Sequence, residues 1–259
     1  MFPGFTLFGR FISMYAVMGI VGIFAAFPLA IHWYKKRTGD DISMIFVLLF
    51  SAIGGFIGMH LLYGITNISR WGELTQATGF IDFLNRFLNI FGGSVYFGGL
   101  IGGVTAGLIS VKVQKLPVDT VTDCVAPAIP LFHGFARIGC FLGGCCYGVE
   151  SEFGFVYEHS LMPEADGVRR FPVQLAESVF NFALFFVLWT LLRKNKFKGK
   201  LLLLYLMIYS AGRFTIEFWR GDTIRGFIFG LSTSQFIGII VFTVSAVLLI
   251  IKQFRKKNA

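Results

Sequence analysis

Residues 42–64 read ISMIFVLLFSAIGGFIGMHLLYG, an apolar run without Asp, Glu, Lys or Arg. At 1.5 Å of rise per residue, a helix of about 20 residues crosses a hydrocarbon layer of about 30 Å, so this run predicts a membrane-spanning helix. The whole chain has a similar character: 55% of its 259 residues are hydrophobic, 14% are charged, and the mean hydropathy is +0.72. Soluble domains carry about 25% charged residues, so the composition excludes a soluble domain.

Apolar blocks of similar length predict an all-α polytopic membrane protein with seven transmembrane helices, forming one membrane domain over residues 1–259. The first block follows only Arg10 and has no small-residue cleavage site, which indicates a retained helix and not a signal peptide. The blocks lie near residues 11–33, 42–64, 91–111, 118–136, 172–192, 200–218 and 231–251.

Two longer connecting segments, near 65–90 and 137–171, predict a small head outside the membrane. Within the first, the apolar spacing of residues 81–90 predicts a short amphipathic helix that lies in the membrane interface. Within the second, residues 153–157 predict part of a β-hairpin.

Basic residues predict the orientation, because Lys and Arg accumulate in cytoplasmic loops. They cluster after the first, third, fifth and seventh blocks, at 35–37, 112–115, 193–200 and 252–257. All clusters then fall on one side, which predicts an outside N-terminus, a cytoplasmic C-terminus and an odd number of spans. The net charge of +9 is thus attributed to membrane topology, and nucleic-acid binding is not expected.

Lysine and arginine are distributed differently across the predicted membrane. All eleven lysines fall on the inner face, whereas nine arginines lie at or beyond the outer half. Arginine offers a planar fork of donors that suits phosphate, so this set predicts a phosphorylated ligand reached from the outer leaflet. The alternative is anchorage by snorkelling to headgroups, which is favoured for the first three. The nine are Arg10, Arg70, Arg86, Arg137, Arg169, Arg170, Arg213, Arg220 and Arg225.

Ionisable residues close to the apolar blocks predict the functional site, because charge there is costly. They are Arg137, Glu177, Arg213 and Glu217. Arg213 and Glu217 stand four residues apart on one helix face, so a structural ion pair is the alternative reading. Arg220 continues that face and leaves an excess of positive charge, which favours binding of an anion.

Three cysteines, Cys140, Cys145 and Cys146, lie in the run RIGCFLGGCCYG at 137–148. The predicted topology places them outside, where disulfides persist, so a disulfide between Cys140 and one of the other two is the leading prediction. A thiolate nucleophile activated by Arg137 is the alternative. There is no CxxC pair, so no metal site is predicted, and no cofactor is expected.

Four short motifs connect the chain with a known family. They read ARIGCFLGGC at 136–145, RFTIEFWR at 213–220, FPVQLAE at 171–177 and GGLIG at 98–102. They resemble the runs GRIGNFINGE, RFxxEFxR, HPxQLYE and GGLIG of the prolipoprotein diacylglyceryl transferases. The resemblance extends from Tyr15 to about Gln235, and the four motifs together are far more specific than any one of them.

The resemblance implies a multi-pass enzyme of the bacterial plasma membrane whose active site faces the outer leaflet. Members of this family move the diacylglyceryl group of phosphatidylglycerol to a lipobox cysteine thiol and release glycerol phosphate. The implied partners are phosphatidylglycerol, other membrane lipids and an acceptor lipoprotein or other envelope molecule. The implied catalytic residues are Arg137, Arg213 and Glu217, and the substrate-binding positions are Tyr15, Gly98, Gly99, Arg137, Gly139, Gln174, Glu177, Arg213 and Arg220.

The chain departs from the family at four positions. Phe97 replaces a histidine, Cys140 an asparagine, Cys145 a glutamate and His60 an arginine. The residues that handle phospholipid are retained, whereas part of the machinery that accepts and deprotonates a protein thiol is missing. Three alternatives therefore stay open: a glycan or lipid acceptor, transfer of the glycerol-phosphate half, and phospholipid binding or translocation without catalysis.

Overall fold

The computed structural model describes residues 1–222 and 226–257, most of which are helical. They fall into two compact units, a larger one formed by Met1–Trp33 with Thr122–Ala259 and a smaller one formed by Tyr34–Val121. Arg225, one of the nine outer arginines, lies outside the described residues. The prediction of a single membrane domain is untested by this division and stays a prediction.

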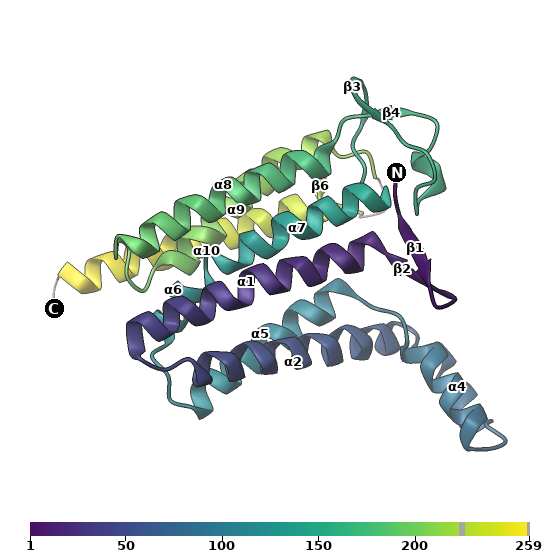
Figure 1. Ribbon diagram of the computed structural model, residues 1–259, viewed down its shortest axis with the longest axis horizontal. Helices are drawn as coiled ribbons and strands as arrows, with labels where there is room; N and C mark the ends of the chain where they lie inside the picture. The colour runs from purple at the N-terminus through teal and green to yellow at the C-terminus, as the bar shows by residue number, and fades with distance from the viewer. Residues whose placement is uncertain (223–225, 258–259) are drawn as a thin grey trace. The chain divides into compact units, whose positions relative to one another are not determined.

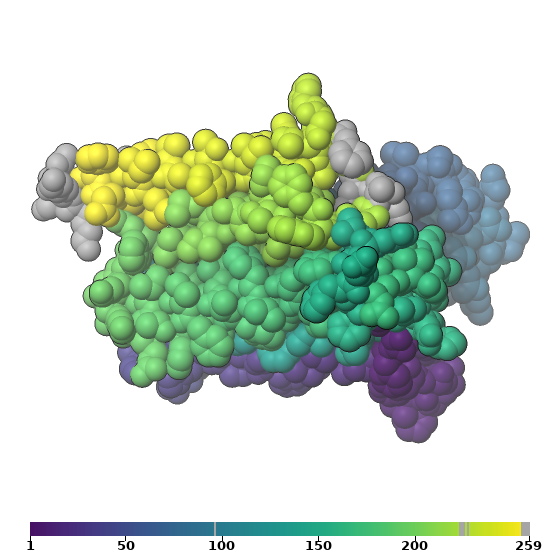
Figure 2. Space-filling view, turned by 90° about the horizontal axis from the view of Figure 1, so that it is seen from above, coloured from purple at the N-terminus to yellow at the C-terminus, as the bar shows by residue number. Residues whose placement is uncertain are grey.

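The helices of the larger unit are α1 (Met14–Thr38), most of which belongs to it, α6 (Val118–Val125), α7 (Ala128–Gly143), α8 (Val173–Arg193), α9 (Leu201–Ile216) and α10 (Thr233–Lys257). Helices α7, α8 and α9 run alongside one another, and α10 packs against α9 (Figure 1). In the space-filling view, α9 lies between α8, in green, and α10, in yellow (Figure 2). Side chains of α7, α8 and α9 therefore meet in the interior of the bundle.

Short strands lie at the end of the larger unit where α7 finishes (Figure 1). They form three antiparallel pairs: β1 (Gly4–Leu7) with β2 (Arg10–Ser13), β3 (Glu150–Val156) with β4 (Arg169–Arg170), and β5 (Phe227–Ile228) with β6 (Leu231–Ser232). Two 3-10 turns accompany them, η2 (Pro163–Ala165) and η3 (Glu217–Trp219). Residues 144–172, called the head below, enclose a small core of Tyr147, Tyr157 and Ala165.

Side-chain caps fix where α9 and α10 begin. The buried Asp123 carboxylate accepts hydrogen bonds from the backbone N–H groups of Gly199 (2.7 Å) and Leu201 (3.1 Å) at the start of α9. At the start of α10, Ser232 Oγ accepts from Gln235 N (3.2 Å) and Gln235 Oε1 accepts from Ser232 N (3.1 Å). Both sets of contacts satisfy backbone N–H groups that the first turn of a helix leaves without partners, and the second is a reciprocal capping box.

The smaller unit contains α2 (Ile42–Thr66), η1 (Ile68–Arg70), α3 (Gly72–Thr75), α4 (Phe80–Phe91) and α5 (Tyr96–Val113). Helices α2 and α5 pack at very close range through glycines. A Cβ added at Gly98 would lie 2.3 Å from the carbonyl oxygen of Gly58, and one at Gly54 would lie 2.6 Å from that of Gly102. Only glycine permits this separation of the two backbones.

Six helical segments among the described residues are long and apolar enough to cross a membrane. They are Met14–Thr38, Ile42–Thr66, Val118–Gly143, Val173–Arg193, Leu201–Trp219 and Thr233–Phe254. The predicted block near 91–111 is the exception, because its apolar helix, Phe97–Val113, is shorter. A multi-pass membrane protein is therefore confirmed, whereas seven spans, the orientation and the extracytoplasmic side of the head stay predictions.

Several local predictions are confirmed or corrected. The amphipathic helix predicted at 81–90 is α4. The hairpin predicted around 153–157 falls on β3, whose antiparallel partner is the next strand, β4, across a long connection at 157–168. The block near 118–136 is two helices, α6 and α7, between which Pro127 lies. The all-α prediction omits the pairs β1–β2 and β5–β6, whose strands of two to four residues are too short to leave an alternating apolar pattern, whereas β3 falls at the predicted hairpin.

Candidate active site

Glu177 on α8 is the centre of a buried charge cluster. Its side chain is only 2% exposed, and its Oε1 lies 3.1 Å from Arg137 Nε on α7 and 4.0 Å from Arg213 Nε on α9. The Tyr209 hydroxyl donates to the same oxygen at 3.3 Å, and His133 Nε2 lies 3.7 Å away. One carboxylate thus holds two guanidinium groups, from two neighbouring helices, next to each other.

Arg213 is also positioned by contacts with η3 and α10. Its Nη1 forms an ion pair with Glu217 Oε2, as the four-residue spacing predicts, and its Nη2 donates to Ser234 Oγ at 3.3 Å. Ser234 lies in the first turn of α10, just after the capping box. The Arg213 side chain is 9% exposed, so its orientation is set by protein contacts and not by solvent.

Arg220 is held by Asp222, a residue that the sequence motifs do not include. Arg220 Nε and Nη2 donate to the two carboxylate oxygens of Asp222, both at 3.0 Å, and the side chains are 3% and 10% exposed. Burial raises the pKa of Asp222 above its ordinary value, although Arg220 acts in the opposite direction. This bidentate pair offsets the excess positive charge that the sequence predicted at Arg220.

Arg137 makes few contacts with protein acceptors among the described residues. Its Nε faces Glu177 but is buried without a well-aligned hydrogen bond among the described residues. The hydrogen bond recorded for its terminal nitrogens joins Nη1 to Cys140 Sγ at 3.9 Å, a weak contact. The fork of Arg137 therefore retains donors for an anionic ligand.

Tyr15 and Gly139 meet where α1 packs on α7. A Cβ added at Gly139 would lie 3.0 Å from the Cα of Tyr15, so close helix packing accounts for this glycine. The Tyr15 side chain is half exposed. Tyr15 therefore lies against the part of α7 that carries Arg137, and substrate binding by Tyr15 and Gly139 stays a prediction.

Gln174 and Arg170 hold the head together. Gln174 Oε1 accepts from the Tyr157 hydroxyl at 3.0 Å, and its Nε2 donates to the carbonyl of Cys145 at 2.8 Å. Arg170 donates to three backbone carbonyls at 3.1 to 3.4 Å and lies over the ring of Tyr147, 4.5 Å from its centroid. These contacts give both residues structural roles, and substrate binding by Gln174 stays a prediction.

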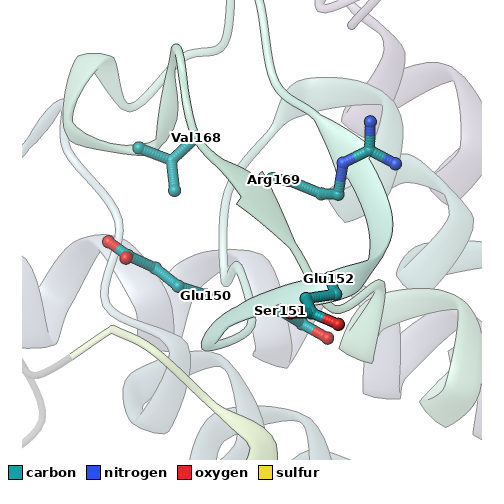
Figure 3. Close-up of a pocket in the computed structure, with 5 residues that line it drawn as sticks. All are labelled: Glu150, Ser151, Glu152, Val168 and Arg169. Atoms are coloured by element: carbon teal, nitrogen blue, oxygen red, sulfur yellow. The ribbon is translucent and has the colours of Figure 1, made fainter.

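A shallow hollow on the surface of the head contains none of the buried cluster residues. It is lined by Glu150, Ser151, Glu152, Val168 and Arg169 (Figure 3). The side chains of Arg169 and Glu150 point to opposite sides of this hollow (Figure 3). Arg169 is exposed, unlike its neighbour on β4, and forms no part of the buried cluster.

Cys140, Cys145 and Cys146, called the thiol cluster below, converge at the end of α7. Their sulfur atoms all lie within 4.8 Å of one another. None of the four cysteines of the chain, all of them described, is disulfide-bonded in this structure. The predicted disulfide and the predicted nucleophile therefore both stay predictions, and the spacing did not reveal that all three sulfur atoms meet.

The remaining predicted residues lie in the smaller unit. The approach of Gly98 to Gly58 accounts for that glycine by packing, and substrate binding by Gly98 and Gly99 stays a prediction. His60 Nδ1 lies 2.9 Å and 2.8 Å from the carbonyl oxygens of Phe91 and Gly93.

Two of the outer arginines in the smaller unit form local ion pairs. Arg70 pairs with Glu73 at 2.9 Å, and Arg86 pairs with Asp82 at 3.0 Å. Each guanidinium is paired with a carboxylate three or four residues away, and anchorage to headgroups stays a prediction.

Three contributors to the buried cluster were missed by sequence reasoning. Tyr209 stands four residues before Arg213, so helical spacing is a signal that could have identified it. Asp222 stands two residues after Arg220, which is a weaker signal. Ser234 has no sequence signal, because only the packing of α10 on α9 brings it to Arg213.

The fold and the cluster define a class: a multi-pass membrane protein with interlocked arginine–carboxylate pairs buried between its helices. Comparison with known proteins then identifies the family. The family model described as prolipoprotein diacylglyceryl transferase matches residues 4–251. The chain belongs to this family, as the motif resemblance predicts.

Individual relatives agree with the family match. The chain is 39% identical over 241 residues to phosphatidylglycerol-prolipoprotein diacylglyceryl transferase 2 of Clostridium perfringens, covering 91% of this chain and 89% of the relative. It is 35% identical over 256 residues to the phosphatidylglycerol-prolipoprotein diacylglyceryl transferase of Clostridium tetani, covering 98% of each. The protein of the same name from Campylobacter jejuni is 31% identical over 264 residues, covering 98% of this chain and 94% of the relative.

Proposed function

We propose that this protein transfers the diacylglyceryl group of phosphatidylglycerol to the cysteine thiol of a prolipoprotein. Family membership and the names of the relatives support the donor and the acceptor. The observation that carries the proposal is the state of Arg137, which is buried against Glu177 and whose terminal nitrogens have no strong acceptor among the described residues. A phosphate diester is an acceptor that matches such a fork.

In the proposed reaction, the acceptor sulfur attacks the carbon of the diacylglyceryl group that is bonded to the phosphate oxygen. A C–S bond forms as the C–O bond breaks, and glycerol phosphate leaves with the electron pair. Arg137 and Arg213 stabilise the negative charge that grows on the departing phosphate, in a buried setting where such interactions are strong. Glu217 orients Arg213, and Glu177 holds the two arginines together.

The other readings left open by the sequence are not favoured. The relatives are named for transfer to a prolipoprotein, and none of those described above is named for a glycan acceptor, for transfer of glycerol phosphate or for lipid translocation. The phospholipid-side residues Arg137, Arg213 and Glu217 serve each of these readings equally, so only the product distinguishes them.

A reconstituted assay tests the function. We expect the protein in nanodiscs to add a diacylglyceryl group to a lipobox peptide and to release an equal amount of glycerol phosphate from phosphatidylglycerol. Mass spectrometry of the peptide and quantification of glycerol phosphate measure the two products. The same peptide with Ser in place of its Cys is the control. Unmodified peptide beside consumed phospholipid would point to another acceptor, and unconsumed phospholipid would refute an enzymatic role.

We also propose that α5 crosses the membrane, which brings the number of spans to seven, and that the head lies outside the plasma membrane. The support is charge parity, because every lysine falls on one side only with an odd number of spans. A reporter fused after residue 257 is expected to be active only in the cytoplasm, and one inserted near residue 160 only outside. Topology mapping with paired reporters checks this, and reversed signals would place the buried cluster toward the cytosol.

A further inference from the structure

The thiol cluster has the dimensions of a metal site. Zinc–sulfur bonds are about 2.3 Å long, which puts the sulfur atoms of a zinc site about 3.8 to 4.0 Å apart. The three sulfur atoms here lie within 4.8 Å of one another, so closure of less than about 1 Å completes the geometry. The number of sulfur atoms also favours a metal site over a disulfide, because a disulfide would use two of them and leave the third thiol unexplained.

The backbone of the cluster is held in place from several directions. Helix α7 ends at Gly144 in the left-handed region (φ 70°), and Cys145 N donates to the carbonyl of Cys140 at 3.1 Å. Cys146 is itself left-handed (φ 56°), which is strained for a residue with a side chain. Strain of this kind persists where surrounding contacts impose it, and it is concentrated at functional sites.

Those surrounding contacts come from elements far along the chain. Gln174 Nε2 on α8 donates to the carbonyl of Cys145 at 2.8 Å. Gly221 N donates to the carbonyl of Tyr147 at 3.0 Å, immediately after Arg220. The two adjacent cysteines are therefore held between α8 and the segment after η3, facing Cys140 at the end of α7.

A cationic side chain lies beside the thiol cluster. Arg137 Nη1 is 3.9 Å from Cys140 Sγ. Three thiolates with a divalent ion carry a net charge of −1, and the guanidinium of Arg137 lies beside them. Soft sulfur ligands select d10 ions such as Zn²⁺ over Mg²⁺ or Ca²⁺.

From this geometry we infer that Cys140, Cys145 and Cys146 form a three-thiolate site for a soft d10 metal ion, of which Zn²⁺ is the representative. Sites with three protein ligands leave a fourth position open, as catalytic zinc sites do. This site adjoins Arg137, so, given the proposed function, its open position takes the sulfur of the acceptor cysteine. Two of the three ligands, Cys140 and Cys145, stand at positions where the chain departs from its family motif.

The role in the reaction follows from the balance of atoms. The acceptor thiol loses its proton to solvent on binding, and its sulfur then forms the C–S bond as the C–O bond to phosphate breaks. A cysteine of the protein acting as nucleophile would instead become a thioether, whose C–S bond a second thiol does not displace. Metal ligation thus gives the cluster a role that allows turnover.

Metal binding to the full-length protein in detergent, reduced and freed of metal, tests the site directly. We expect one Cd²⁺ per chain, followed by sulfur-to-cadmium charge-transfer absorption, with Zn²⁺ competing for the same site. Cys145→Ser and Cys146→Ser are expected to weaken binding at least about tenfold, since each removes one ligand. The matched control is Cys124→Ser, because Cys124 is a buried cysteine on α6 outside the cluster. Thermal unfolding checks that the variants fold.

The outcomes separate this proposal from the proposed function. No stoichiometric metal in the parent, equal binding by Cys146→Ser, or a Cys140–Cys145 or Cys140–Cys146 disulfide that persists in the isolated protein overturns the site. Chelation is expected to lower lipobox-peptide modification by about 10- to 100-fold, with recovery on adding Zn²⁺. Full transfer by the chelated protein rejects the open-position role and leaves the proposed function intact. Metal binding without any transfer supports the site and refutes the function.

Discussion

Arg137→Lys is expected to lower diacylglyceryl transfer by about 10²- to 10³-fold while the protein remains folded, the cost of losing one well-placed charge-stabilising donor. Lysine keeps the positive charge that Glu177 balances at 3.1 Å, so the buried pair survives. It cannot reproduce the planar fork, whose terminal nitrogens have no strong acceptor in the part of the chain that the structure describes. Activity should therefore fall much more than stability.

Arg213→Lys extends this comparison to the second arginine. A phosphate-binding role predicts a loss of transfer similar to that of Arg137→Lys, whereas a purely structural pair with Glu217 predicts that lysine is tolerated. The matched control is Arg70→Lys, because Arg70 forms an ion pair with Glu73 in the smaller unit and its side chain is 42% exposed. Lipid turnover and thermal unfolding are measured together in nanodiscs. Parental turnover by both Arg137→Lys and Arg213→Lys would reject the phosphate clamp.

Glu177→Ala is expected to destabilise the protein by about 3–5 kcal/mol and to abolish transfer. The carboxylate is 2% exposed and lies beside both Arg137 and Arg213, so its removal leaves two buried guanidinium groups facing each other without their shared counter-ion. Glu177→Gln keeps an oxygen for the Tyr209 hydroxyl but removes the charge. This variant should fold better than Glu177→Ala and still lose most of its activity.

The control for Glu177 is an acidic residue of the head surface. Glu152→Gln changes an exposed carboxylate at the rim of the shallow hollow and is expected to alter stability by less than about 0.5 kcal/mol. Denaturation in detergent and the peptide-transfer assay measure both series. A Glu177→Ala protein with parental stability and turnover would show that the carboxylate does not organise the arginines.

Local spacing explains which parts of the site the sequence could predict. Arg213 and Glu217 are four residues apart on α9 and η3, so the geometry of a helix alone brings them together. Glu177 lies 40 residues after Arg137 and 36 before Arg213, and its place between them depends on how α7, α8 and α9 pack. The resemblance identified it as a site residue, but its position as shared counter-ion came from the structure.

In the head, too, a local feature was predictable from the sequence and a long-range contact was not. The strand at 153–156 was predictable from local pattern, whereas its pairing with Arg169–Arg170 was not, because the paired residues are thirteen or more positions apart in the sequence. Arg170 was grouped by residue type with the phosphate-binding candidates. In the structure, the Arg170 guanidinium donates to three backbone carbonyls, a role that neither composition nor spacing indicates.

The sequence by itself determined the membrane class, six of the spanning segments, the local Arg213–Glu217 pair and the family. These depend on hydropathy and on short spacing along one element, which the order of residues states directly. Only the tertiary structure decided that Glu177 joins Arg137 to Arg213, that Asp222 occupies the fork of Arg220, and that three sulfur atoms converge. These residues meet only because helices pack together and the chain turns at the end of α7. The strength of their interactions depends on burial, which exists only in the folded protein.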